Sequence, residues 1–201
     1  MRVLVVYAHP NPASFCHALL RRVESALDEA GHEVRVKDLY AEGFNPVLSA
    51  AEFGALNDGR VPEVIAHEQA ALAWAEALVF IYPLWWFGTP AILKGWFDKT
   101  LTHGFAFEYG PGGQRGLLAA RRALVLIAAG SGESEFESMQ AKELLTRPVA
   151  DGTLRFCGVD EVRAKVFYSV PGVTQEARAL MLEEAAVLAS AIGEAGGWAA
   201  V

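Results

Sequence analysis

Three short segments of the chain carry residue types that could bind a phosphate or a flat ring. The first, residues 9–15 (HPNPASF), places His9 and Ser14 just before a predicted helix. Ser14 is suited to cap that helix, and the unpaired N–H groups of a first helical turn attract anions. The segment could therefore hold a phosphate, although a capping serine without a ligand explains the same residues equally well. It lacks the Gly-x-Gly-x-x-Gly pattern of dinucleotide-binding Rossmann domains.

The second segment, residues 82–90 (YPLWWFGTP), presents three large aromatic residues in a row. Successive side chains of an extended chain point to opposite faces, so Trp85, Trp86 and Phe87 cannot all enter one core. A large exposed apolar patch usually marks an interface, so we expect a flat ring or a second subunit to cover these side chains. A dense corner of the core is the alternative.

The third segment, residues 130–133 (GSGE), is rich in glycine. Gly130 and Gly132 would let backbone N–H groups approach a ligand carbonyl or an anionic ring edge. The signal is weak when taken alone, because a glycine-rich loop after a strand is often only a turn. A phosphate loop, an aromatic platform and a glycine-rich wall together favour a nucleotide with a flat ring, such as a flavin.

Short apolar runs alternate with longer amphipathic runs, which is typical of strands and helices that build a parallel sheet. Five strands are predicted, over residues 3–8, 33–39, 77–82, 123–129 and 163–170. Five helices are predicted, over residues 15–30, 63–75, 91–101, 137–145 with a continuation towards 156, and 175–192.

This pattern predicts one α/β domain over residues 1–201, a doubly wound three-layer sandwich with strand order 2-1-3-4-5. In that order the carboxyl ends of the first, third and fourth strands lie together, so the three segments are expected to meet. Residues 110–113 are expected to form a plain loop before the fourth strand.

Composition excludes several classes of protein. With 53% hydrophobic and 20% charged residues, the chain is suited to a buried core and not to disorder. The net charge of −7 disfavours nucleic acid as a partner. Cys16 and Cys157 show no metal-ligand spacing, and a reducing cytoplasm is the simplest location. Proline and glycine interrupt the longest apolar stretch, residues 77–93, so no membrane span is predicted.

Several stretches together resemble a known family, the flavodoxin-like NAD(P)H:quinone oxidoreductases. The most specific of them is PLWWFGTPAILKGWF at residues 83–97. The others lie at residues 9–15, 39–41, 44–49, 104–107 and 155–158, so the resemblance spans most of the chain.

The resemblance implies a flavin site with named residues. The flavin phosphates would lie against His9, Ser14, Phe15 and Cys16. The isoalloxazine ring would lie against Pro83, Leu84, Trp85, Trp86 and Phe87. The N–H groups around Gly130, Ser131 and Gly132 are candidates to stabilise charge on the reduced ring.

Two more residues match family positions outside these loops. Arg178 matches an arginine of FAD-binding members, although an ordinary solvated helix charge is an equally good explanation. Tyr109 matches an aromatic residue that closes over the substrate from a dimer partner.

The resemblance implies two-electron, ping-pong hydride transfer from NAD(P)H to a quinone or another aromatic acceptor, performed by a homodimer. FAD is the expected cofactor and FMN is possible. Trp86, Gly130 and Tyr109 are the expected catalytic residues. The family's tyrosine and histidine after the glycine-rich loop are absent here: Glu133 or Phe136, and then Met139, occupy those positions.

Other functions stay open at this stage. Some relatives are regulatory flavoprotein subunits of potassium-efflux transporters. A flavodoxin-type electron carrier is disfavoured, because the Ser/Thr-rich phosphate loop of flavodoxins is absent. A hydrolase that uses Cys16 is the weakest alternative, because no His–Asp pair accompanies that thiol and a buried cysteine is commoner.

Overall fold

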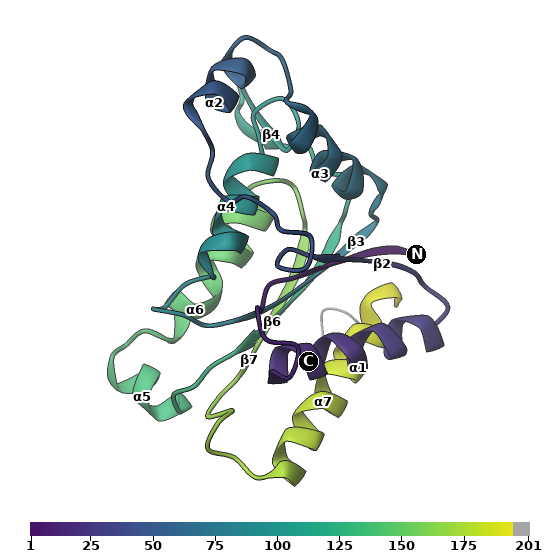
Figure 1. Ribbon diagram of the computed structural model, residues 1–201, viewed down its shortest axis with the longest axis vertical. Coiled ribbons are helices and arrows are strands. Elements are labelled where there is room, and N and C mark those ends of the chain that lie inside the picture. The colour runs from purple at the N-terminus through teal and green to yellow at the C-terminus, as the bar shows by residue number, and fades with distance from the viewer. Residues whose placement is uncertain (195–201) are drawn as a thin grey trace.

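A five-stranded parallel sheet organises the computed structural model, which describes residues 1–194 (Figure 1). The predicted flavodoxin-like strand order is confirmed as β2-β1-β3-β6-β7, and each neighbouring pair is parallel. The strands are β1 (Arg2–Tyr7), β2 (Glu33–Asp38), β3 (Ala77–Pro83), β6 (Arg122–Ala128) and β7 (Glu161–Phe167).

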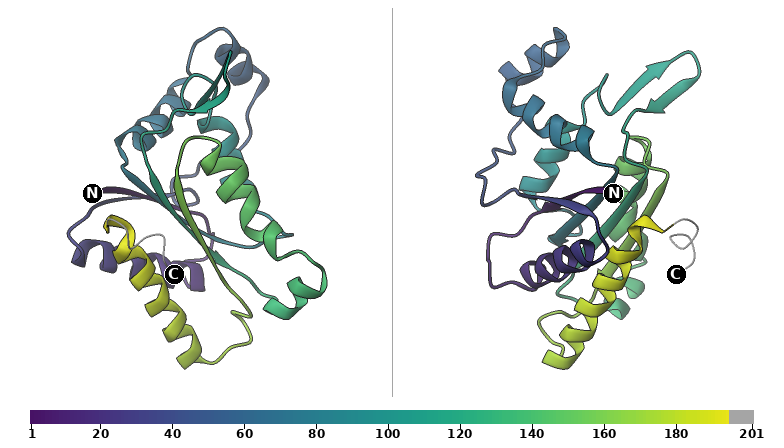
Figure 2. Two further views of the ribbon diagram at one scale, coloured as in Figure 1. Left: turned by 180° about the vertical axis from the view of Figure 1, so that it is seen from behind. Right: turned by 90° about the vertical axis from the view of Figure 1, so that its right-hand side faces the viewer.

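Helices cover both faces of this sheet (Figures 1 and 2). One face lies against α1 (Phe15–Glu29) and α7 (Gln175–Ser190), and the other against α3 (Glu63–Trp74), α4 (Ala91–Thr100) and α6 (Lys142–Val149). None of the helices within residues 1–194 is long and apolar enough to cross a bilayer.

Side chains of the central strand β3 alternate between two cores. Leu78, Phe80 and Tyr82 pack on the α3/α4 side, whereas Val79 and Ile81 pack on the α1/α7 side. Because both faces of the strand are buried, its sequence is a continuous apolar run, as is typical of parallel sheets.

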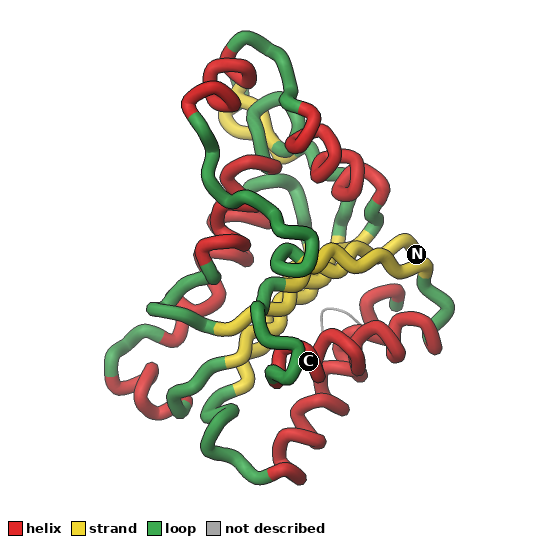
Figure 3. The backbone as a smooth tube through the Cα atoms, viewed as in Figure 1, coloured by secondary structure: helices red, strands yellow, loops and turns green. Residues whose placement is uncertain are grey.

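Three local predictions differ from the structure (Figure 3). The prediction of a plain loop at 110–113 is wrong, because these residues form the end of a hairpin, β4 (Phe107–Gly110) and β5 (Gly113–Gly116). The single helix predicted over 137–145 is wrong as well: α5 (Glu133–Ser138) stops before α6, because Gln140 adopts a left-handed φ of 53°. A further helix, α2 (Ala50–Asn57), was not predicted. A π-helical turn (Ala150–Arg155) follows α6, and a short 3-10 turn (Ala191–Gly193) follows α7.

A buried lysine ties α4 to the segment that leads into α2. The Lys99 ammonium lies 2.8 Å from Glu52 Oε1 and donates hydrogen bonds to the carbonyls of Asn45 and Val47. The hydrogen bond from Lys99 lowers the pKa of the Glu52 carboxyl to about 2. The chain packs closely here, because a Cβ atom on Gly95 of α4 would lie 2.2 Å from the Pro46 carbonyl oxygen.

We expect Gly95→Ala to lower the free energy of unfolding by roughly 1–3 kcal/mol, because the added methyl displaces the backbone of Pro46. Gly54→Ala in α2 is the matched control, since a Cβ there meets nothing within 4 Å. That control should be neutral, or stabilising by up to about 1 kcal/mol through helix propensity. Urea unfolding followed by circular dichroism measures both, and equal midpoints for the two variants would contradict the packing argument.

Candidate functional site

The three loops predicted to meet do so at the carboxyl edge of the sheet. The Leu84 N–H donates to the Ala128 carbonyl at 2.8 Å, and the rings of His9 and Trp85 lie 6.0 Å apart. Between the second and third loops lies a cavity of about 310 Å³, which we call the edge pocket. It is lined by Leu84, Trp86, Phe87, Gly130, Ser131, Glu135, Phe136 and Met139.

A tight turn presents the aromatic residues of the second loop. Trp85 and Gly88 exchange two backbone hydrogen bonds of 3.1 and 3.0 Å, while Trp86 and Phe87 adopt φ values of 49° and 60°. Two successive left-handed residues are the signature of a type I′ turn, which normally uses asparagine and glycine. A tryptophan and a phenylalanine are therefore held there under strain, which is typical of functional sites.

The turn leaves its central residues available to a ligand. The Trp86 side chain is 99% exposed, whereas the Phe87 ring packs edge-on against Phe136 at 5.6 Å. Within residues 1–194, the N–H groups of Trp86 and Phe87 form no hydrogen bond. The same is true of the N–H groups of Gly130, Ser131 and Gly132 in the third loop, judged over the described part of the chain.

The first loop has the predicted cap. Ser14 Oγ accepts a hydrogen bond from the His17 N–H at 3.1 Å, and the N–H groups of Phe15 and Cys16 are unpaired among the described residues. His9 Nδ1 accepts from the Asn11 N–H at 3.0 Å, and burial lowers the pKa of His9. A neutral His9 accepting at Nδ1 carries its proton on Nε2, so it can donate one hydrogen bond to a ligand.

A buried tyrosine hydroxyl under this loop was missed by the sequence analysis. Tyr7 ends β1, its ring lies 6.0 Å from the His17 ring, and burial raises its pKa to about 12. Its hydroxyl is fully buried and makes no hydrogen bond of good geometry within residues 1–194, and Ser14 is the polar side chain beside it.

Cys16 cannot serve as a nucleophile. Its side chain is buried in the core beneath α1, and burial raises the pKa of the thiol to about 12. Because the reactive form of cysteine is the thiolate, this environment opposes the hydrolase hypothesis. The residue can contribute only its backbone N–H to the loop.

Arg178 lies beside the first loop and is not a freely solvated charge. Its guanidinium donates hydrogen bonds to the carbonyls of Val170, Pro171 and Val173. Arg178 also lines a groove of about 470 Å³ that reaches Ser14 and Phe15. The groove therefore continues directly from the first turn of α1 to the guanidinium.

Tyr109 is not brought to the edge pocket of its own chain. It lies on the β4–β5 hairpin, is 66% exposed and stacks on His103 at 6.3 Å between ring centroids. The hairpin projects from the body near the end of α4 that lies away from the loops (Figures 1 and 2).

Of the residues expected where the family's tyrosine and histidine would be, two line the edge pocket. Phe136 and Met139 line the edge pocket, but Glu133 does not, because its carboxylate pairs with Lys142 at 2.6 Å. Glu135 lines the pocket as well, and sequence analysis missed it.

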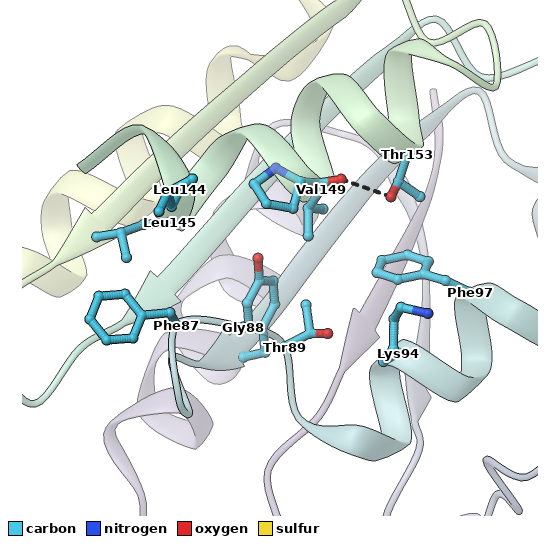
Figure 4. Close-up of a pocket in the computed structure, with 11 residues that line it drawn as sticks. Phe87, Gly88, Thr89, Lys94, Phe97, Leu144, Leu145, Val149 and Thr153 are labelled. Atoms are coloured by element: carbon cyan, nitrogen blue, oxygen red, sulfur yellow. Dashed lines mark hydrogen bonds between the residues drawn. The ribbon is translucent and has the colours of Figure 1, made fainter. Parts of the chain in front are cut away.

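A second cavity of about 290 Å³ lies between α4 and α6, behind Phe87 (Figure 4). Phe97 and Lys94 of α4 lie at one end of it, and Phe87 and the α6 residue Leu145 lie at the other. Thr153, which donates a hydrogen bond to the Pro148 carbonyl, also lines it. Its lining is mostly apolar, so α4 and α6 leave an apolar groove between them.

Comparison with known proteins identifies the family. A family described as having a flavodoxin-like fold matches residues 1–190. The protein named "Uncharacterized NAD(P)H oxidoreductase" of Haemophilus influenzae is 36% identical over 92% of this chain and 93% of its own length. Rat NAD(P)H dehydrogenase [quinone] 1 is 34% identical over 90% of this chain and 74% of its own. The chain belongs to the flavodoxin-like NAD(P)H:quinone oxidoreductase family.

A solved structure of this family superimposes on nearly the whole chain. NAD(P)H:quinone oxidoreductase from Methanothermobacter marburgensis is 33% identical, with a TM-score of 0.87, over 97% of this chain and 98% of the other.

We expect Trp86→Asn to raise the free energy of unfolding of the ligand-free protein by about 0.5–1 kcal/mol. Asparagine tolerates the left-handed φ of 49°, and the fully exposed indole packs against nothing that would be lost. Phe87→Asn is the matched control: it relieves similar strain but removes the ring contact with Phe136, so it should give no gain. Chemical unfolding of both variants measures this, and a destabilised Trp86→Asn would refute the idea of stored strain.

Proposed function

We propose that this protein is a flavin-dependent NAD(P)H:quinone oxidoreductase. The observation that carries the proposal is the edge pocket, where a fully exposed Trp86 and the unpaired N–H groups of two loops lie together. The names of the relatives support the reaction class. A bound flavin would supply the two-electron relay: NAD(P)H gives up a hydride, and a quinone takes up its two electrons with one proton from the hydride and one from solvent to become a hydroquinone.

The first loop is suited to the flavin phosphates. The N–H groups of Phe15 and Cys16, with Ser14 beside them, form the positive end of α1. The free Nε2 position of His9 adds a donor to the same place. The residues present therefore fit a phosphate group.

The second and third loops are suited to the flavin ring. Backbone from Pro83 to Phe87 would lie along it, and Gly130, Ser131 and Gly132 would direct N–H groups at its pyrimidine edge. Fixed N–H donors stabilise negative charge that develops during a reaction without having to reorganise. Such donors replace the side-chain tyrosine and histidine of other family members.

We further propose a homodimer in which Tyr109 of one chain covers the edge pocket of the other. Within one chain, α4 separates the hairpin from the pocket by roughly 15 Å, because it has ten residues at 1.5 Å each. The exposed hairpin and the apolar α4–α6 groove offer a surface for a second copy. The free, buried cysteines are consistent with a cytoplasmic location, where NAD(P)H is supplied.

Anaerobic titration tests the activity. Addition of NADH or NADPH to the purified holoprotein should bleach the flavin absorbance near 450 nm, and a quinone should restore it with a stoichiometry of about one two-electron acceptor per flavin. Absence of bleaching with either nucleotide would overturn the proposal. A stable semiquinone on partial reduction would instead indicate a one-electron carrier.

FAD is the proposed form of the flavin, because the groove from the first loop to Arg178 extends past the place of the first phosphate. We expect Arg178→Gln to weaken FAD binding about tenfold and to leave FMN binding within about twofold, since one charge-assisted hydrogen bond to the distal phosphate is lost. FMN binding is the internal control for a loss of loop structure. If removing the guanidinium disordered residues 170–173, the binding of FAD and the binding of FMN would both be weakened. Fluorescence titration of the apoprotein gives both constants, and an equal loss for FAD and FMN would contradict this role.

A further inference from the structure

The edge pocket contains one carboxylate, that of Glu135. Glu135 is the only charged residue among the eight that line this cavity. Its carboxylate makes no hydrogen bond or ion pair within residues 1–194, whereas its neighbours Glu133 and Glu137 on the same helix both do. The negative charge of Glu135 therefore reaches the pocket without a compensating cation beside it.

The short helix α5 separates Glu135 from its acidic neighbours. Glu133 and Glu137 stand one turn apart and both contact the Lys142 ammonium, at 2.6 and 2.9 Å. Glu135 lies two residues from each of them, which is about 200° around a helix, so it faces the other way. Two glutamates of α5 thus share one lysine, and the third lines the edge pocket.

We propose that Glu135 selects electron acceptors by charge, so that the site takes uncharged and cationic aromatic acceptors and discriminates against anionic ones. The inference rests on the proposed function, since it concerns what stacks beside Trp86 and Phe87. A ring that carries a sulfonate or carboxylate, stacked on a flavin held in the edge pocket, would bring a second negative charge near Glu135 at the pocket wall. Like charges a few ångströms apart repel, and because the Glu135 side chain is exposed, solvent and salt screen part of this repulsion.

The same charge does not oppose the reacting ring of the donor. The nicotinamide ring of NAD(P)H is uncharged before it gives up its hydride and cationic afterwards, so the carboxylate stabilises the oxidised ring. Glu135 is for this reason a specificity-determining residue and not a general obstacle to turnover.

The test compares two quinones with the same ring system, 1,4-naphthoquinone and its 2-sulfonate, in the holoenzyme. The ratio of kcat/KM for the sulfonate to that for the uncharged quinone should rise about tenfold in Glu135→Gln, mainly through KM. Glu135→Asp should retain the wild-type ratio within about threefold, because it keeps the charge. High salt should raise the wild-type ratio and have less effect on Glu135→Gln.

Glu137→Gln is the matched control on the same helix, because Lys142 keeps Glu133 as its partner. This control should leave the ratio within about twofold; an increase equal to that of Glu135→Gln would attribute the effect to overall charge and overturn the proposal. An unchanged ratio in Glu135→Gln would overturn it as well.

A binding measurement separates this proposal from the proposed function. Calorimetric titration of the oxidised holoprotein with 2-naphthalenesulfonate and with 2-naphthol needs no turnover. Glu135→Gln should tighten the sulfonate about tenfold relative to the naphthol. Loss of quinone reduction with this binding shift intact would refute only the proposed function. Normal quinone reduction without the shift would refute only the role of Glu135.

Discussion

Parallel pairing of the strands is the constraint on which the whole site depends. Parallel strands need a crossover connection, so the chain returns to the same edge of the sheet each time and the carboxyl ends of all strands lie together. β1, β3 and β6 are neighbours, with Tyr7 opposite Ile81 and Pro83 opposite Ala128. The loops after these strands therefore meet although they are far apart in sequence.

The site that results relies on backbone more than on charged side chains. Its free donors are the N–H groups of a helix N-terminus, a left-handed turn and a glycine-rich loop. Such donors carry fixed partial positive charge, which is how a chain with a net charge of −7 can present an attractive surface to an anionic nucleotide. Among residues 1–194, no lysine or arginine lines the edge pocket. The N–H groups that this backbone conformation leaves unpaired, including those of the left-handed turn at Trp86 and Phe87, therefore provide the positive potential that lysine and arginine provide in more basic proteins.

The parts of this architecture that sequence could predict are those with a strong pattern. Three of the five strands, β1, β3 and β6, are continuous apolar runs buried on both faces, and Ser14 stands where a cap is needed, so their positions follow from residue type. The β4–β5 hairpin could not be predicted, because residues 107–116 contain four glycines and only two large apolar side chains. Tyr7 and Tyr82 look like ordinary members of apolar runs, and only the structure shows that each hydroxyl is buried and makes no hydrogen bond of good geometry within residues 1–194. Glu135 is one of three alternating glutamates, and only the position of Lys142 distinguishes it from the others.

Two strongly exposed aromatic residues, Trp86 and Tyr109, lie on either side of α4 in the sequence. Trp86 precedes this helix and Tyr109 follows it, so the rigid helix keeps the two exposed rings at opposite ends of the same unit. A two-fold axis exchanges such ends: a contact from residue i of one copy to residue j of the other is repeated from j to i. A dimer built on the α4–α6 groove would therefore form both covered pockets at once, each from the turn of one chain and the hairpin of the other. The same geometry means that separating the subunits would open both pockets together.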